Sequence, residues 1–161
     1  MNVPDFDACC ALDSPVGNIN LYAKNDKVVF LTMGDQAVAD WGKAKVLGQA
    51  KKQLVDYFKG KNKMLNFPVA FKGTAFQEAV WAEIATLGWG ETSTYAEIAE
   101  AIGNPKAVRA VGGAVGSNPV PLVIGCHRVL GASKKITGYS GGDGIPTKKW
   151  LLALESIDYK D

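Results

Sequence analysis

The chain has 161 residues, of which 47% are hydrophobic and 21% charged, and its formal net charge is +2. This length fits a soluble globular protein of one domain or two small ones, and the charge excludes any global electrostatic argument for a nucleic-acid partner. Three cysteines, two of them adjacent, exclude a disulfide framework and indicate a reducing compartment. No apolar run approaches the roughly 18 residues of a membrane span, and the N-terminus lacks the basic region of a signal peptide. We therefore expect a cytoplasmic protein, or a nuclear one in a eukaryote, with no membrane partner.

The first predicted element is a β-hairpin. Apolar and polar residues alternate over residues 18–24, and residues 27–33 are rich in valine, phenylalanine and leucine. Asn25 and Asp26 lie between these segments as a turn, and residues 13–17 precede them as a loop.

A helix and a closing strand are predicted next. Apolar residues recur at helical spacing over residues 46–58, with Gly60 as the C-terminal cap. Residues 67–71 alternate and predict a strand. The lysines near this helix indicate either a solvated face or a nucleic-acid patch, and we favour the solvated face. Cys9 and Cys10 lack a neighbouring histidine and further ligands, so we expect no zinc site.

The chain changes character near residue 73, and we expect an α/β domain over residues 1–72 and a second domain over residues 73–161. Thr74 and Gln77 have the spacing of a capping box, in which the two side chains cap a helix start reciprocally. Apolar residues then follow at helical spacing as far as Leu87.

A helix-turn-helix pattern follows. Thr94 and Glu97 form a second capping box, residues 103–105 break the helix that it opens, and a third helix runs from residue 106 to about residue 115. Two helices joined by a short turn with glycine are typical of DNA-binding domains, although other helical hairpins share the pattern.

Two features favour nucleic-acid binding here. No Asp or Glu occurs over residues 101–142, whereas Lys106, Arg109 and Arg128 do, and a locally positive surface can meet phosphates. The third helix also contains Gly112 and Gly113, and glycine inside a helix costs about 1 kcal/mol relative to alanine. Either the helix packs closely on the protein's own core, or DNA approaches it closely, and both interpretations stay open.

Cys126 is a candidate nucleophile because it directly precedes His127, the single histidine of the chain. Residues 118–125 predict a turn and a short buried strand, so the thiol would lie at a strand end. The thiolate is the reacting form and needs a base. Neighbouring residues on a strand point to opposite faces, so a contact between the two side chains would need a turn or a bridging water. The alternative is a buried structural cysteine beside a hydrogen-bonded histidine.

Glu155 is a candidate for the carboxylate that orients the histidine. It lies next to the apolar stripe of a C-terminal helix that Pro146 and Thr147 open. The alternative is a solvated glutamate at a helix end. Between the two candidates, residues 137–142 form a glycine-flanked Tyr-Ser loop that suits either the edge of a flat ligand such as a base or an ordinary turn.

These motifs together resemble the O6-alkylguanine-DNA alkyltransferase family over residues 74–156. The matching segments are Thr94-Tyr95-x-Glu97-Ile98-Ala99, Arg109-Ala110-Val111-Gly112-Gly113-Ala114, Asn118-Pro119, Cys126-His127-Arg128-Val129 and Gly138-Tyr139-Ser140-Gly141-Gly142. The family usually has proline before the cysteine, where this chain has Gly125.

The resemblance implies direct reversal of DNA damage. Cys126 would irreversibly accept one alkyl group from O6 of guanine, or from O4 of thymine, with no cofactor and no metal. The partner would be double-stranded DNA carrying the lesion, bound through its minor groove without sequence preference by a monomer. The implied fold is α/β: a small antiparallel-sheet domain like ribonuclease H, followed by a winged helix-turn-helix domain that carries the cysteine.

The resemblance also assigns site residues. His127, Glu155 and a water would activate Cys126, Tyr95 would donate a proton toward the guanine, and Arg109 would fill the gap left by the flipped nucleotide. The catalytic group would be Cys126, His127, Glu155, Asn118, Tyr95 and Lys148, where Asn118 holds the turn and Lys148 assists. The DNA contacts would be Arg109, Lys106, Arg128, Tyr95, Ala110, Gly112, Gly113 and Ser117. The base pocket would be formed by Val129, Tyr139, Ser140 and Gly141.

Two other functions fit the same patterns. One is a DNA-binding protein without chemistry, either a lesion sensor or a winged-helix regulator. The other is an unrelated cysteine hydrolase. A nucleophile at position 126 argues against the lesion sensor, because family relatives that bind without repair lack that cysteine.

Overall fold

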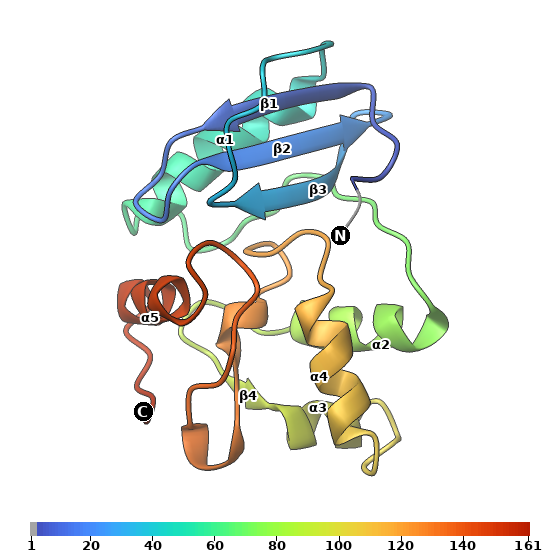
Figure 1. Cartoon of the computed structure of the whole chain (residues 1–161), viewed down its shortest axis with the longest axis vertical. Helices are drawn as coiled ribbons and strands as arrows, with labels where there is room; N and C mark the ends of the chain where they lie inside the picture. The colour runs from blue at the N-terminus through green and yellow to red at the C-terminus, as the bar shows by residue number, and fades with distance from the viewer. Residues whose placement is uncertain (1–2) are drawn as a thin grey trace.

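The structure, a computed structural model, describes residues 3–161, and its N-terminal part is a three-stranded antiparallel sheet covered by one helix (Figure 1). The strand order is β1-β2-β3. The elements are β1 (Ala8–Leu12), β2 (Ile19–Lys24), β3 (Lys27–Met33) and α1 (Lys45–Phe58). The apolar stripe of α1 packs on the inner face of the sheet, so this part has its own hydrophobic core.

The predicted hairpin is confirmed, and its turn shows why the register is fixed. Asn25 and Asp26 have φ values of 52° and 58°, as the tight turn between two twisted strands requires. The turn also caps α1, because the backbone N–H of Val46 donates to Asp26 Oδ1 at 2.9 Å. One short polar turn therefore joins the sheet to the helix that covers it.

Two strand assignments differ from the prediction. β1 was not predicted, because its cysteines face two apolar clusters on opposite sides and no polar alternation marks the strand. The strand predicted over residues 67–71 is wrong. Only Val69 forms an isolated bridge, to Val28, and Pro68 in that segment has no N–H to extend a ladder.

The C-terminal part is mainly helical. Its elements are α2 (Ala75–Ile84), β4 (Ser93–Thr94), α3 (Tyr95–Ala101), α4 (Val108–Gly116), η1 (Cys126–Arg128), β5 (Val129–Leu130), η2 (Ala132–Lys134) and α5 (Ile145–Leu154). Both predicted capping boxes are present, at the start of α2 and of α3. Helices α2, α3 and α4 share a second core, and β4 pairs in parallel with β5. The pair α3 and α4 forms the predicted helix-turn-helix.

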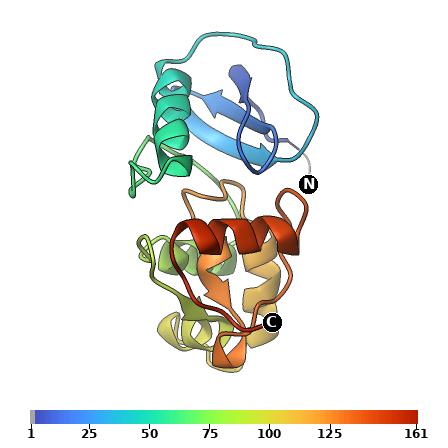
Figure 2. The ribbon, with the colours of Figure 1, turned by 90° about the vertical axis from the view of Figure 1, so that its left-hand side faces the viewer.

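The two parts meet at the segment that leads to Cys126. The backbone N–H of Leu31 in β3 donates to the carbonyl of Pro119 at 3.0 Å. Val120, Leu122 and Leu151 of the C-terminal part belong to the core of the N-terminal part. Figure 2 shows α5 along the side of the C-terminal part that faces the sheet layer. Within residues 3–161, no helix is both long and apolar enough to span a membrane.

Candidate active site

Cys126 begins a short 3-10 turn, so the prediction that it lies at the end of a buried strand is wrong. Residues 118–125 form a tight loop, in which Leu122 has a φ of 78°. The Asn118 side chain holds this loop from both sides, because Nδ2 donates to the Ile124 carbonyl at 2.7 Å and Oδ1 accepts from the Val120 N–H at 2.9 Å. The loop fixed by Asn118 therefore positions the thiol, and Cys126 is only 4% exposed.

The turn settles how the neighbouring histidine can point inward. In a 3-10 turn, successive side chains are about 120° apart rather than on opposite faces. His127 is fully buried, and its Nε2 lies 2.6 Å from Oε2 of Glu155, at the end of α5. The turn therefore brings the predicted histidine and carboxylate together.

Glu155 is 2% exposed and accepts five hydrogen bonds, so the alternative of a solvated glutamate is wrong. Oε1 accepts from Arg128 Nε at 2.8 Å and from the backbone N–H of Gly90 at 3.1 Å. Oε2 accepts from Arg128 Nη2 at 3.0 Å, and it lies 2.6 Å from both the Tyr57 hydroxyl and His127 Nε2. A carboxylate held by this many donors is fixed in both position and rotation.

The protonation states follow from these contacts. Burial alone would raise the pKa of Glu155, but hydrogen bonds from His127 and Arg128 outweigh it and hold that pKa well below its usual range. Burial lowers the pKa of His127 despite the opposing effect of Glu155. At neutral pH the pair is thus a carboxylate and a neutral imidazole, with Arg128 balancing the charge.

A neutral His127 leaves one ring nitrogen ready to accept a proton. Nε2 is the atom that contacts the carboxylate, so it carries the hydrogen and donates it. Nδ1 then carries the lone pair, and within residues 3–161 it is buried and has no hydrogen-bond partner. The arrangement can remove a proton from a nearby acid.

The Cys126 thiol is protonated at rest. Burial raises its pKa, while Asn118, Tyr139 and the charge of Lys148 act in the opposite direction. Lys148 is itself buried, donates from Nζ to the carbonyl of Val129 at 2.7 Å, and has a pKa lowered by burial to about 8. A thiolate must therefore be generated for reaction, and the Lys148 ammonium is close enough to stabilise it.

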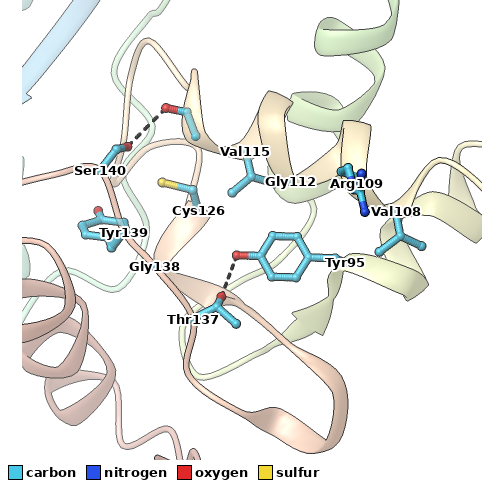
Figure 3. Close-up of a pocket in the computed structure, with 11 residues that line it drawn as sticks. Tyr95, Val108, Arg109, Gly112, Val115, Cys126, Thr137, Gly138, Tyr139 and Ser140 are labelled. Atoms are coloured by element: carbon cyan, nitrogen blue, oxygen red, sulfur yellow. Dashed lines mark hydrogen bonds between the residues drawn. The ribbon is translucent and has the colours of Figure 1, made fainter.

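A cavity of about 570 Å³ opens above the thiol, between α4 and the glycine-flanked loop (Figure 3). Its lining includes Cys126, Tyr95 and Tyr139. The Tyr95 hydroxyl lies 2.8 Å from Thr137 Oγ1, and Ser140 Oγ donates to the Gly116 carbonyl at 3.2 Å. A volume of this size with few polar groups suits a small planar ligand such as a nucleobase.

The outer face of α4 has three glycines with open space beside them. A Cβ atom at Gly112, Gly113 or Gly116 would meet nothing within 4 Å. The interpretation that these glycines permit close packing on the protein's own core is therefore wrong, and the helix leaves open space for something outside the chain. Arg109 and Ala110 are exposed on the same helix, and Lys106 is exposed just before it.

Three predicted site residues lie elsewhere than expected. The Arg128 guanidinium is buried on Glu155 and on the Leu87 carbonyl, so the prediction that it contacts DNA is wrong. Val129 is fully buried and lies outside the cavity lining, with its carbonyl engaged by Lys148. The Ser117 hydroxyl is engaged by the protein itself, because it donates to the Ala114 carbonyl and accepts from Gln77 Nε2.

Two residues of this region were missed. Thr137 contacts the Tyr95 hydroxyl, and Tyr57 contacts Glu155 from α1. In the sequence, Tyr57 is one more aromatic residue in an apolar stripe, and nothing distinguishes it from a purely structural one.

Within the described part of the chain, no group of three or more His, Cys, Asp and Glu side chains is placed to hold a metal ion.

Comparison with known proteins places this geometry in a family. Residues 75–157 match the family described as 6-O-methylguanine DNA methyltransferase, DNA binding domain, and residues 9–71 match its ribonuclease-like domain. A constitutive methylated-DNA–protein-cysteine methyltransferase of Bacillus subtilis is 37% identical over 92% of this chain and 95% of its own length. A methylated-DNA–protein-cysteine methyltransferase of Haemophilus influenzae is 40% identical over 92% of this chain and 86% of its own.

A solved structure agrees. The crystal structure of Mycobacterium tuberculosis OGT in complex with DNA superposes with a TM-score of 0.83 at 38% identity and covers 92% of each chain. The fold is thus α/β, with a ribonuclease-like N-terminal domain and a DNA-binding C-terminal domain, as expected. With both family descriptions matched and the buried Cys126, His127 and Glu155 in one network, the chain belongs to the 6-O-methylguanine DNA methyltransferase family.

Proposed function

We propose that this protein repairs DNA by direct reversal, moving the alkyl group from O6 of a guanine to Sγ of Cys126. The observation that carries the proposal is the position of the thiol. It lines a cavity large enough to admit a nucleobase, beside a helix face without side chains, and His127, the next residue, contacts Glu155. The same reaction extends to O4 of thymine, whose alkylated oxygen has the same chemistry.

The proposed reaction balances without a cofactor. A water passes the thiol proton to His127 Nδ1, and the carboxylate of Glu155 stabilises the imidazolium that forms. The thiolate attacks the alkyl carbon, the bond from that carbon to O6 breaks, and its electron pair goes to the guanine. Tyr95, whose hydroxyl lines the cavity, donates a proton to the leaving base. The proton count closes when the imidazolium proton passes through solvent to the Tyr95 phenolate, which leaves both His127 and Tyr95 neutral.

Two groups support the thiolate. Burial raises the pKa of the thiol, and the charge of Lys148 acts against that rise. Asn118 holds the loop that carries Cys126. The product thioether has no route back to a thiol in this site, so each chain acts once and the reaction is stoichiometric.

The DNA side of the proposal uses α4. We propose that this helix enters the minor groove, because its bare glycine face lets the backbone approach and its small side chains offer few base-reading groups. Arg109 fills the gap of the flipped nucleotide, and Lys106 contacts phosphate. Gly112, Gly113 and Ala110 form the approach surface, which is why binding is independent of sequence.

The flipped base enters the cavity, where Tyr139 and Ser140 lie around the thiol. Gly141 lines an adjoining pocket that also includes Cys126. We propose that the chain works as a monomer and that its domains divide at residues 72 and 73. The N-terminal domain carries no part of the DNA surface in this scheme.

Replacement of Cys126 by alanine tests the proposal. Methyl transfer from duplex DNA containing O6-methylguanine should be lost, whereas affinity for that duplex should stay within about twofold, because removal of a buried thiol leaves the α4 face intact. Cys10→Ala is the matched control, since Cys10 is another buried free thiol but lies in the N-terminal sheet. It should transfer as the unmodified protein does.

The alternatives give different results. A protein that only binds lesions would show tight binding and no transfer in the unmodified chain. A cysteine hydrolase would turn over an ester or peptide many times. Loss of both transfer and DNA affinity in Cys126→Ala would contradict the division between thiol and binding surface.

A further inference from the structure

Tyr57 joins the N-terminal domain to the catalytic network. It lies in the last turn of α1, 98 positions before Glu155, and its hydroxyl donates to Oε2 of Glu155 at 2.6 Å. The residue is 1% exposed. Within residues 3–161, the other donors to this carboxylate are Arg128, His127 and the backbone of Gly90, all from the C-terminal domain.

The position of the hydroxyl is set by rigid packing. The Tyr57 ring makes edge contacts with Phe58 and Trp89, with centroids 5.3 and 5.4 Å away. Burial and the neighbouring carboxylate raise the pKa of Tyr57, so the hydroxyl is always protonated and always a donor. A donor fixed in this way limits the rotation of the carboxylate that it binds.

The atom that Tyr57 binds is also the atom that matters for the reaction. Oε2 receives the phenol, His127 Nε2 and Arg128 Nη2, whereas Oε1 is held by Arg128 Nε and the backbone N–H of Gly90. If the carboxylate turned, the hydrogen bond that sets the histidine tautomer would lengthen. The phenol also withdraws charge from Oε2, which makes that oxygen a weaker partner for a protonated imidazole.

We propose that Tyr57 is a positioning residue for alkyl transfer, which fixes the Glu155 carboxylate so that His127 keeps its basic nitrogen directed away from Glu155. The proposal rests on the proposed function above. It gives the N-terminal domain a part in the chemistry of the C-terminal domain, beyond packing against it.

Removal of the hydroxyl should change the titration of His127 in a definite direction. The charged groups that act on His127 are Glu155, Arg128 and Lys148. Without the phenol, Arg128 and Gly90 still keep the carboxylate within hydrogen-bond reach of His127, so the larger change is in charge. Oε2 then carries more charge and stabilises the imidazolium better, so the pKa of His127 rises. Because an imidazolium cannot accept the thiol proton, the transfer rate falls as His127 becomes protonated. A higher pKa of His127 therefore moves this fall in rate, the acid limb of the pH profile, to higher pH.

The experiment compares Tyr57→Phe with the unmodified protein and with Tyr22→Phe. The first variant keeps the buried ring and loses only the hydroxyl. Tyr22 is a second buried tyrosine of the same domain, outside the Glu155 network, so it is a matched control. Single-turnover methyl transfer is measured across pH, with the melting temperature of each protein. Because the chain has one histidine, nitrogen-15 NMR follows the ring of His127 directly, without DNA.

For Tyr57→Phe we expect transfer about three- to tenfold slower at pH 7. The acid limb should move up by about half a pH unit, with a matching rise in the NMR titration, and Tyr22→Phe should match the unmodified protein. Identical rate profiles and histidine titrations for Tyr57→Phe and the unmodified protein would overturn the proposal, whatever the melting temperatures. The NMR titration does not depend on the proposed function. If the unmodified protein transferred no methyl group, the proposed function would be contradicted. The effect of Tyr57 on His127 would then be decided by the NMR titration alone.

Discussion

The interior around Glu155 and the outer face of α4 are built in opposite ways. At Glu155, one carboxylate accepts five hydrogen bonds and is almost wholly buried. On α4, Gly112, Gly113 and Gly116 leave space in which a Cβ would touch nothing. Cys126 lines the cavity beside α4, and the next residue, His127, contacts Glu155.

This contrast separates two physical requirements. Proton transfer needs groups held within a few tenths of an ångström, which a saturated and buried network provides. The sequence-independent DNA contact proposed for α4 needs a surface that does not read bases, which a helix of small residues would provide. A substitution in one region should therefore affect chemistry, and a substitution in the other should affect DNA affinity.

The largest expected effect comes from Glu155→Gln. The amide cannot stabilise the imidazolium and leaves the buried Arg128 without a counter-ion. Methyl transfer should slow by at least about a hundredfold, and the free energy of unfolding should fall by about 3–5 kcal/mol. Transfer kinetics and urea denaturation measure the two effects. Glu78→Gln, an exposed carboxylate on α2, should change neither.

The same variant tests the charge state through pH. The folded-state pKa of Glu155 lies below the roughly 4.3 of an unfolded glutamate. Its carboxylate thus stabilises the fold above that pH, and the contribution is lost as pH falls below about 4. The unmodified protein should lose stability in this acid range more steeply than Glu155→Gln. Parallel curves would contradict an ionised Glu155.

Gly113→Leu should produce the next largest effect, on DNA affinity. The side chain would fill the open face of α4, and we expect duplex binding at least about tenfold weaker, which corresponds to about 1.4 kcal/mol. Transfer from the free base O6-benzylguanine should be unchanged. Both properties are measurable by titration and single-turnover kinetics.

Gly48→Leu is the matched control for this change. Gly48 is also a helical glycine at which a Cβ would meet nothing within 4 Å, but it lies on α1. Both substitutions should stabilise their helices by about 0.8 kcal/mol. Equal losses of DNA affinity in the two variants would show that the α4 face is not the binding surface.

Arg109→Ala should have a smaller effect that depends on the substrate. If the side chain fills the gap of a flipped nucleotide, repair of duplex DNA should slow by about five- to tenfold, with little change for the free base. The ratio of the two rates is the measurement. A similar loss on both substrates would mean that Arg109 does not act in flipping.

Gly125→Pro should have the smallest effect. The φ of Gly125 is −72°, which proline adopts without strain. A Cβ there would lie 2.9 Å from Nη1, 3.1 Å from Cδ and 3.3 Å from Cζ of Arg128, so the guanidinium must shift by a few tenths of an ångström against Glu155 and the Leu87 carbonyl. We expect stability within about 1 kcal/mol and a transfer rate within about threefold of the unmodified protein, by denaturation and kinetics. Gly125→Ala adds the Cβ without the ring, and a tenfold loss in either variant would contradict this account.

Local rules explain what the sequence could predict. The hairpin turn at Asn25 and Asp26, both capping boxes and the helix stripes depend on residues close together in the chain, and all are confirmed. The residue pattern offered Glu155 as a candidate carboxylate for His127, the family resemblance assigned the two as partners, and the structure places them 2.6 Å apart.

The errors concern contacts between distant segments. The sequence suggested that Arg128 is a cation free to contact DNA, because Glu155, with which it pairs in the interior, lies 27 positions later in the chain. Tyr57 was missed because its partner is 98 positions away. The apolar residues before Cys126 predicted a strand, but hydrogen bonds from the Asn118 side chain determine the shape of this loop. Which polar groups are buried depends on tertiary packing, and the spacing of residues along the sequence does not reveal it.

Transfer of one methyl group to Cys126 can be measured by mass spectrometry of the unmodified protein, after reaction with excess duplex DNA containing O6-methylguanine. We expect a gain of one methyl group per chain, found on the Cys126 peptide, with Cys9 and Cys10 unmodified and no second turnover. An unchanged mass, methylation at another residue, or repair of more than one lesion per chain would contradict it.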